Sequence, residues 1–258
     1  MRKICLIMNT ILIEAIRRRE IYAVILLSCV MIGVVGSIRF FNLPDLGVFY
    51  RETALKIMGL ASTLTIIILA ARQLPREFER RTIYTLLAKP VGRGQFLIGK
   101  FLGVMGAGVF CYGLFMIIFT CGLFYLQTRV QWTLLAQHVY LQILALAIIA
   151  SLAFMLSLVG NLDMAITVSA LIYLLAQVFT ASLTLIYGYV GTVGQWMLQG
   201  LNYLIPQISL FSLSAKVAHG DLWGPISWNA MMTLTLYAAC YVTVFLMISY
   251  LLFRRRPL

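Results

Sequence analysis

Six long apolar stretches constrain this chain more than any other feature of its sequence. Each is long enough to cross about 30 Å of hydrocarbon as an α-helix. Because 62% of the residues are hydrophobic and only 11% are charged, no part of the chain is polar enough to form a soluble domain. The sequence therefore predicts an all-α integral membrane protein with six transmembrane helices in one domain, residues 1–258. The six stretches are residues 21–38, 53–71, 101–126, 139–159, 164–187 and 231–253.

Basic residues set the predicted orientation. Most of the 20 lysines and arginines lie near the two chain ends or in residues 72–100. Because cytoplasmic loops carry an excess of Lys and Arg, both termini and the 72–100 loop are predicted to be cytoplasmic. The expected location is the cytoplasmic membrane of a bacterium or archaeon. The net charge of +12 then reflects topology and indicates no nucleic-acid partner.

The N-terminal segment, residues 1–20, places its apolar side chains along one helical face, with charged residues off that face or at its ends. This pattern predicts an interfacial helix that lies on the membrane. A cleaved signal peptide is the alternative. Because no small-x-small cleavage site follows the apolar part, we expect the segment to be retained.

Residues 72–100 are the only long charged stretch between two apolar ones. They must lie in water, because a charge at the bilayer centre costs about 2.5 to 3.5 kcal/mol. Apolar residues recur at three- and four-residue spacing around Pro75, which suits the first turn of a helix. Glu77 and Arg81 can pair one turn apart. Pro90 should stop this short amphipathic helix, and Gly92 should form a turn before the next span.

The same loop carries a family resemblance. A Glu-Phe-Glu-Arg-x-Thr segment, then Leu-Leu-x-x-Pro-Val-x-Arg, then Phe-x-x-Gly-Lys before an apolar helix resembles the ABC-2 type transporter permeases. It is most similar to the branch containing the permease of nitrous-oxide-reductase maturation, and in part to the first intracellular loop of eukaryotic subfamily-G half-transporters. In those families the segment is a coupling helix. The resemblance implies that a separate ATP-hydrolysing subunit would contact Glu77, Phe78, Glu79, Arg80, Arg81, Thr82 and Tyr84.

A basic loop could instead serve only as an orientation signal. Such a signal requires charge, but it requires neither an amphipathic helix nor the Pro-Val-Gly-Arg-Gly turn of residues 90–94. Both features are present, which favours docking.

Residues 94–100 fit the first seven positions of the phosphate-binding pattern G-x-x-x-x-G-K, but the eighth position is Phe101. A nucleotide loop needs Ser or Thr there for Mg²⁺, with a soluble helix behind it, whereas this helix is a membrane span. We therefore expect the chain not to be an enzyme, and ATP hydrolysis to occur in a partner subunit. An intramembrane metalloprotease is not indicated either, because the sequence lacks H-E-x-x-H.

No metal site and no cofactor are predicted. The five cysteines lie in the surface helix or the spans without zinc-site spacing, and they imply no disulfide framework. His138 and His219 stand alone near predicted membrane boundaries. We expect both to be polar residues of the membrane interface.

Small residues cluster at the start of the third span, where Gly99 and Gly103 stand in a G-x-x-x-G relation. Small residues let helices approach closely, so these two glycines are predicted packing positions. The contact could join two copies of the chain, and packing within one six-helix unit is the favoured interpretation.

The spans contain no relay of acids or histidines of the kind that ion-coupled transporters generally need. What remains is a path with Gln142, Asn161, Gln177 and many aromatic and Met residues. Such a path suits a large amphipathic or lipid-like cargo better than a small ion.

Residues 188–228 are too polar for a span and too apolar for an ordinary loop. Apolar residues on both sides of Pro206 predict two short helices that lie at the outer face or dip into it. The Asn-Tyr-Leu-Ile-Pro sequence is also similar to the corresponding region of the ABC-2 branch. That resemblance implies an outer gate at Leu204, Pro206 and Phe211. A solvent-facing interfacial hairpin with no gating role is the alternative.

The combined prediction is the membrane-spanning permease subunit of an ATP-driven ABC exporter. The resemblance implies that it docks a separate ATPase subunit and pairs with a second copy or a homologue, because the path in such a family lies between two six-helix units. Membrane lipid is the remaining expected partner. The alternative function is a non-transporting membrane anchor that recruits an ATPase to act on an extracytoplasmic partner.

Overall fold

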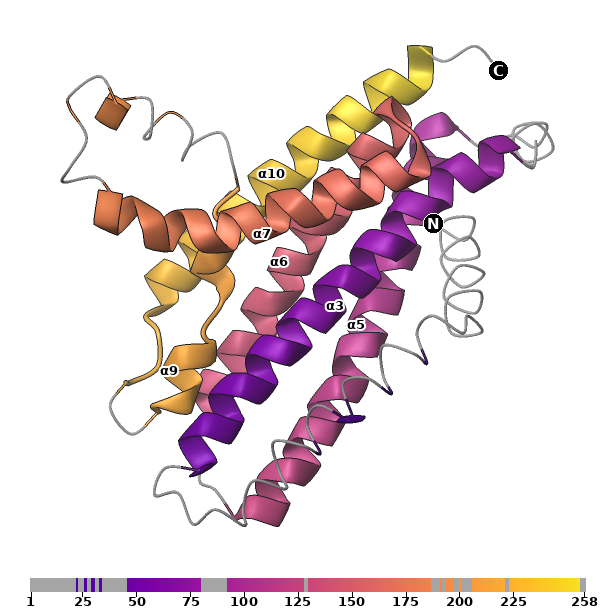
Figure 1. Ribbon diagram of the computed structural model, residues 1–258. Coiled ribbons are helices and arrows are strands. Elements are labelled where there is room, and N and C mark those ends of the chain that lie inside the picture. The colour runs from indigo at the N-terminus through magenta and orange to yellow at the C-terminus, as the bar shows by residue number, and fades with distance from the viewer. Residues whose placement is uncertain are drawn as a thin grey trace.

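Five long helices dominate the part of the chain that the computed structural model describes (Figure 1). The described residues are 46–79, 92–127, 130–186, 206–220 and 223–255, with isolated positions among 22–33 and 191–200. No strand occurs in these parts. The long helices are α3 (Leu46–Glu79), α5 (Arg93–Leu126), α6 (Trp132–Val159), α7 (Leu162–Ile186) and α10 (Trp228–Arg255), and the short elements are the 3-10 helix η2 (Ile208–Phe211) and α9 (Ser214–Ala218).

Helix α6 lies at the centre of the bundle and packs against α3, α5, α7 and α10. Its sequence explains this position, because it carries no Asp, Glu, Lys or Arg and its apolar residues are spread around the whole helix. A helix that is apolar all round is stable only when its whole surface is kept from water, by protein or by lipid. Helix α10, by contrast, leaves many of its large apolar side chains exposed on the described surface.

Short connections make α5, α6 and α7 antiparallel neighbours. Gln127 ends α5 in the left-handed region (φ 51°), and its backbone N–H donates to the Phe124 carbonyl at 3.2 Å. Gly160 ends α6 with its N–H donating to the Leu156 carbonyl at 3.0 Å, and α7 begins two residues later. These caps satisfy carbonyls that the helix ends would otherwise leave unpaired.

The bundle has two distinct ends. We call the end where α3 finishes and α5 begins the loop end, and the opposite end, where η2 and α9 lie, the cap end. Helix α3 runs the whole distance between them, packing against α9 near its start and against α5, α6 and α7 along its length. Figure 1 shows α3 as the long indigo-to-purple helix.

Membrane-spanning length is confirmed for four helices of the described part. They are α3 over Gly47–Pro75, α5 over Arg93–Leu126, α6 over Trp132–Val159 and α10 over Trp228–Arg254. A further apolar segment, Leu162–Gln177 of α7, is shorter. The predicted first span at residues 21–38 and the predicted interfacial helix at residues 1–20 fall outside the described residues, apart from isolated positions. The six-span layout therefore stays a prediction.

The predicted helix start at Pro75 is wrong. Pro75 lies inside α3, which continues without a break to Glu79. A proline in a helix interior removes one backbone hydrogen bond and costs about 3 kcal/mol. Contacts of the preceding turn support the helix here, because Gln73 and Leu74 are buried and the Gln73 Oε1 accepts a hydrogen bond from Lys100 Nζ at 3.2 Å. Residues 72–79 therefore belong to the spanning helix rather than to a separate one.

Helices α3 and α5 approach each other closely at two glycines of α5. A Cβ atom at Gly108 would lie 2.6 Å from Cδ1 of Ile66, and one at Gly122 would overlap the hydroxyl group of Tyr50. The Tyr50 ring also stacks on Phe119, with the ring centroids 5.8 Å apart. Glycine at these two positions is therefore a condition for the observed packing.

Candidate functional site

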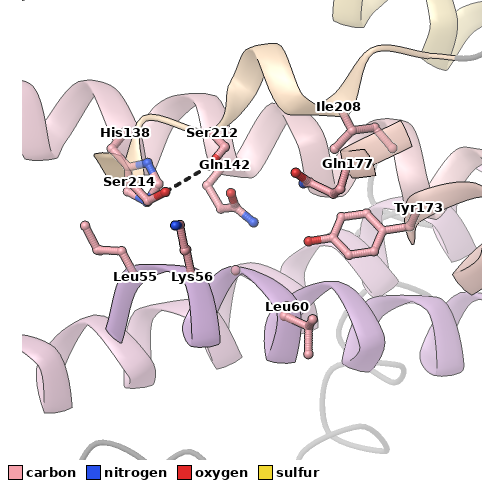
Figure 2. A pocket seen from close by; sticks show the side chains of 11 residues that line it. Leu55, Lys56, Leu60, His138, Gln142, Tyr173, Gln177, Ile208, Ser212 and Ser214 are labelled. Carbon is pink, nitrogen blue, oxygen red and sulfur yellow. Dashed lines mark hydrogen bonds between the residues drawn. The ribbon is translucent and has the colours of Figure 1, made fainter. Parts of the chain in front are cut away.

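A cavity of about 220 Å³ lies in the half of the bundle nearer the cap end. It is enclosed by α3, α6 and α7, with η2 and the start of α9 over it, and Figure 2 shows the polar side chains turned toward it from several elements. The lining residues are Leu55, Lys56, Gly59, Leu60, His138, Gln142, Tyr173, Gln177, Ile208, Ser212 and Ser214.

His138 of α6 is the most deeply buried polar group of this lining, with 2% of its surface exposed. Its Nδ1 accepts a hydrogen bond from the backbone N–H of Leu213 at 3.3 Å. An imidazole that accepts at Nδ1 is neutral and carries its proton on Nε2. That Nε2 is buried and has no hydrogen-bond partner among the described residues. The cavity wall thus holds an N–H donor that no described group satisfies.

Lys56 of α3 is the one charged residue of the lining. Its side chain is exposed, and its Nζ donates to Glu52 Oε1, one turn earlier on α3, at 2.6 Å. An ammonium group has three hydrogens, so this bond leaves Lys56 able to donate to a second acceptor. Figure 2 shows the amino group of Lys56 directed toward Gln142 and His138 across the cavity.

Two amide side chains face the cavity from different helices, Gln142 from α6 and Gln177 from α7. Gly59 of α3 lies beside the Gln142 amide, and a Cβ atom at Gly59 would lie in ordinary contact with it, 3.5 Å from Gln142 Nε2. On the cap side, the hydroxyl groups of Ser212 and Ser214 lie 3.3 Å apart and share a hydrogen bond. Amide and hydroxyl groups can both donate and accept, so they can adapt to a polar ligand.

The cap is held on the bundle by specific contacts. Phe211 is fully buried, and its ring centroid lies 6.2 Å from that of Tyr237 on α10. The Tyr237 hydroxyl accepts a hydrogen bond from the backbone N–H of Gln207 at 3.0 Å. Gln137 of α6 exchanges two hydrogen bonds with the backbone of Ile226, at 2.9 and 3.0 Å. The described part of residues 206–228 is therefore packed onto the helices.

The loop end is also joined across helices. Arg93, the first residue of α5, donates to the backbone carbonyl of Arg254 on α10 at 2.9 Å. Its guanidinium carbon lies 6.0 Å from the ring centroid of Phe253, which stacks on Phe96 at 6.1 Å. These contacts fasten the start of α5 to the end of α10, beside the Lys100 and Gln73 pair that ties α5 to α3.

The comparison with known families agrees with this architecture. The sequence model of the ABC-2 family transporter proteins matches residues 11–258. The chain belongs to the ABC-2 transporter family. No curated protein matches the chain.

Membership of the ABC-2 family confirms the broader sequence-based predictions. The chain is a multi-pass membrane protein, and the family supports its assignment as the membrane subunit of an ABC system. Membrane subunits of this family are generally not enzymes, and an ABC ATPase subunit is their general partner. The match does not test the narrower predictions, which are membership of the nitrous-oxide-reductase branch, export, and docking of an ATPase through residues 72–100.

The predicted ABC-2 docking residues lie at and beyond the loop end. Glu77, Phe78 and Glu79 form the last turn of α3, where the structure describes the backbone. The other four predicted docking residues, Arg80, Arg81, Thr82 and Tyr84, lie outside the described residues. The docking assignment therefore stays a prediction, with three of its positions on a helix that is continuous with the core.

The remaining predicted positions divide between the cap and α5. Pro206 and Phe211 are buried in the cap, and Leu204 lies outside the described residues. Gly99 and Gly103 are buried on α5. The glycines with the tight α3 contacts are Gly108, which belongs to the same cluster of small residues, and Gly122, which the G-x-x-x-G pattern did not indicate.

The cavity brings together part of the predicted polar path. Gln142 and Gln177 line it, whereas Asn161 is exposed beside the start of α7 at the loop end. The location of His138 at the membrane interface stays a prediction, and the structure adds that the cap covers and buries this residue on α6. No sequence signal identified the cap residue, Leu213, that bonds it. Lys56, near the start of the predicted span at residues 53–71, was given no role by the sequence-based prediction.

Proposed function

We propose that this ABC-2 protein is the permease subunit of an ATP-driven exporter and docks its ATPase subunit through residues 72–100. The observation that carries the proposal is the extension of α3 past its apolar part to Glu79. The predicted docking residues Glu77, Phe78 and Glu79 are thereby rigid continuations of a core helix. The loop end would face the cytoplasm of a bacterium or archaeon.

Helix α3 supplies a mechanical link from the docking residues to the cavity. Lys56 and Gly59 line the cavity, and Glu79 ends the same helix. At 1.5 Å per residue, the distance along the axis from Lys56 to Glu79 is roughly 35 Å. Because a packed helix moves as a unit, a shift imposed on its last turn would reach the cavity wall.

The buried contacts of the loop end make this link credible. Gln73 lies six residues before Glu79 and is bonded to Lys100 of α5, and Arg93 of α5 is bonded to α10. A force on the end of α3 would therefore act on three helices together. We propose that two such units, either two copies or one copy and a homologue, pair around the transport path, as closed twofold assemblies commonly do.

The test replaces Phe78 or Glu79 with Ala and co-expresses the chain with the ABC ATPase encoded in a neighbouring reading frame. Each variant should lose ATPase co-purification and the stimulation of ATP turnover while still inserting into the membrane. Val159→Ala is the matched control, because Val159 is exposed where α6 finishes at the same end and lies outside residues 72–100. Normal complex formation and turnover in both docking variants would overturn the assignment.

The same preparation distinguishes an exporter from a membrane anchor. Reconstituted with its ATPase in vesicles, an exporter moves a substrate across the bilayer when ATP is added. An intact complex whose ATP turnover depends on the permease, but which changes only an extracytoplasmic partner protein, would assign the anchor function instead.

A further inference from the structure

We propose that the cavity beneath the cap binds an oxyanion, carried as the head group of a membrane amphiphile. This inference rests on the proposed function, because it names the substrate class that the permease would take. It is carried by the donor groups of the lining, by the size of the cavity, and by the apolar surface beside its opening.

The lining is rich in hydrogen-bond donors and contains no carboxylate. Lys56 supplies a positive charge, and the buried His138 supplies an N–H at Nε2 that no described group satisfies. A buried donor without an acceptor carries a desolvation cost of about 1–3 kcal/mol, which a ligand oxygen would remove. Charge-assisted bonds from an ammonium group to an oxyanion are stronger than neutral ones. The site therefore favours a group with several acceptor oxygens and a negative charge.

Glu52 already binds the Lys56 ammonium group and so limits how an oxyanion can reach it. Its carboxylate holds Lys56 at 2.6 Å from the same helix but is not part of the lining. An incoming oxyanion would share the ammonium group with Glu52 and would enter the cavity that Lys56, Gln142 and His138 line (Figure 2). The Gln142 amide can turn its N–H groups toward it.

The cavity suits a head group and not a whole amphiphile. Its volume of about 220 Å³ lies below the roughly 300–1,000 Å³ of pockets that enclose a drug-sized ligand. Leu60, which lines the cavity, is exposed, and so is Leu64 one turn farther along α3. Residues four apart share a helix face, so an apolar surface leads away from the opening along the span. A tail could stay on this surface in the lipid while the head group enters the cavity.

The experiment measures ligand binding by microscale thermophoresis to the full-length chain in an uncharged detergent. The probes are dioctanoyl phosphatidic acid, dioctanoyl glycerol, which lacks the phosphate, and inorganic phosphate. We expect phosphatidic acid to bind at least tenfold more tightly than the glycerol. Inorganic phosphate that competes as well as phosphatidic acid would keep the oxyanion site and assign it to a free anion. Equal affinity for phosphatidic acid and the glycerol would overturn the proposal.

Variants locate the binding in this cavity. His138→Phe and Lys56→Gln should each weaken phosphatidic acid binding about tenfold, because each removes one donor. Lys56 is exposed, so its variant keeps the test valid even where His138→Phe fails to fold. Gly59→Leu should block the cavity without removing a donor. Lys216→Gln is the matched control, because Lys216 lies at the same end over Trp223 and outside the lining.

Unchanged affinity in both Lys56→Gln and Gly59→Leu would refute the site. The measurement needs neither ATP nor the ATPase, so its outcome is separate from that of the docking test. Loss of docking in the Glu79 variant with intact phosphatidic acid binding would reject the permease proposal and leave the oxyanion site standing. Intact docking without phosphate-dependent binding would reject the oxyanion site and leave the permease proposal standing.

Discussion

A methyl group added at Gly108 tests the packing of α3 against α5. A Cβ atom there would lie 2.6 Å from Cδ1 of Ile66 and 3.2 Å from its Cγ1, and Ile66 is fully buried. Ordinary carbon contacts are about 3.5–4.0 Å, so either the Ile66 side chain or the helix axis must shift. Gly108→Ala is therefore expected to destabilise the bundle.

The size of the effect follows from two opposing terms. Overpacking of a well-packed core costs about 1–3 kcal/mol, whereas replacing Gly by Ala in a helix interior gains about 1 kcal/mol. Gly113 is the matched control, because it lies in the same helix with open space around its Cα. The propensity gain is common to both variants, so Gly108→Ala should be less stable than Gly113→Ala by about 1–3 kcal/mol.

A double-mutant cycle identifies the contact responsible. Ile66→Val removes Cδ1, the atom nearest to the added methyl group, at its own cost of about 0.5–1.5 kcal/mol. The free energy of unfolding is measured by SDS titration of the protein in mixed micelles. The double variant should be more stable than the sum of the single losses predicts, by about 0.5 kcal/mol or more. Equal stability of Gly108→Ala and Gly113→Ala would show that α3 and α5 are not packed as described.

Two further predictions concern orientation and the cap. Both Gly92 and Gly191 have room for a side chain, so each can be replaced by cysteine in a cysteine-free background. In intact cells, Gly92→Cys should be shielded from a membrane-impermeant thiol reagent, whereas Gly191→Cys should react. Labelling of Gly92→Cys alone would reverse the topology. Phe211→Ala should lower the free energy of unfolding by about 3–5 kcal/mol, because the ring is fully buried. Leu210→Ala, at an exposed position of the same turn, should change this free energy much less. Equal losses in the two variants would mean that the cap is not packed on the bundle.

The sequence predicted helices where apolar length alone decides the outcome. The stretches at 101–126, 139–159 and 231–253 all lie within helices of the structure, and each of these helices begins earlier along the chain than the apolar stretch does. A hydropathy pattern does not predict these extensions, because they contain polar residues that are stabilised by tertiary contacts. One such contact joins Arg93 to the Arg254 carbonyl. The prediction that a new helix starts at Pro75 is wrong for the same reason. Local rules favour a break there, and the buried contacts of Gln73 outweigh them.

The cavity was only half visible in the sequence. Gln142 and Gln177 could be singled out, because amides in apolar spans are uncommon enough to notice. Their meeting with His138 depends on how α6, α7 and the cap segment pack, and those contacts join residues far apart in the chain. Neither composition nor spacing contains the bond from Leu213 to His138, so the burial of this histidine could not be inferred.

Helix α3 connects the two proposals, and thermodynamic linkage makes the connection measurable. Its middle part lines the cavity and its last turn carries the predicted docking residues. A ligand can bias a conformational equilibrium only by binding its two states with different affinity. Therefore, if a docked ATPase changes the affinity of the cavity for phosphatidic acid, phosphatidic acid must change the affinity of the permease for the ATPase by the same factor. Measuring both affinities separates a real coupling along α3 from two independent sites on one helix. Equal factors other than one would establish the link, and factors of one would mean that ATP binding reaches the cavity by another route or not at all.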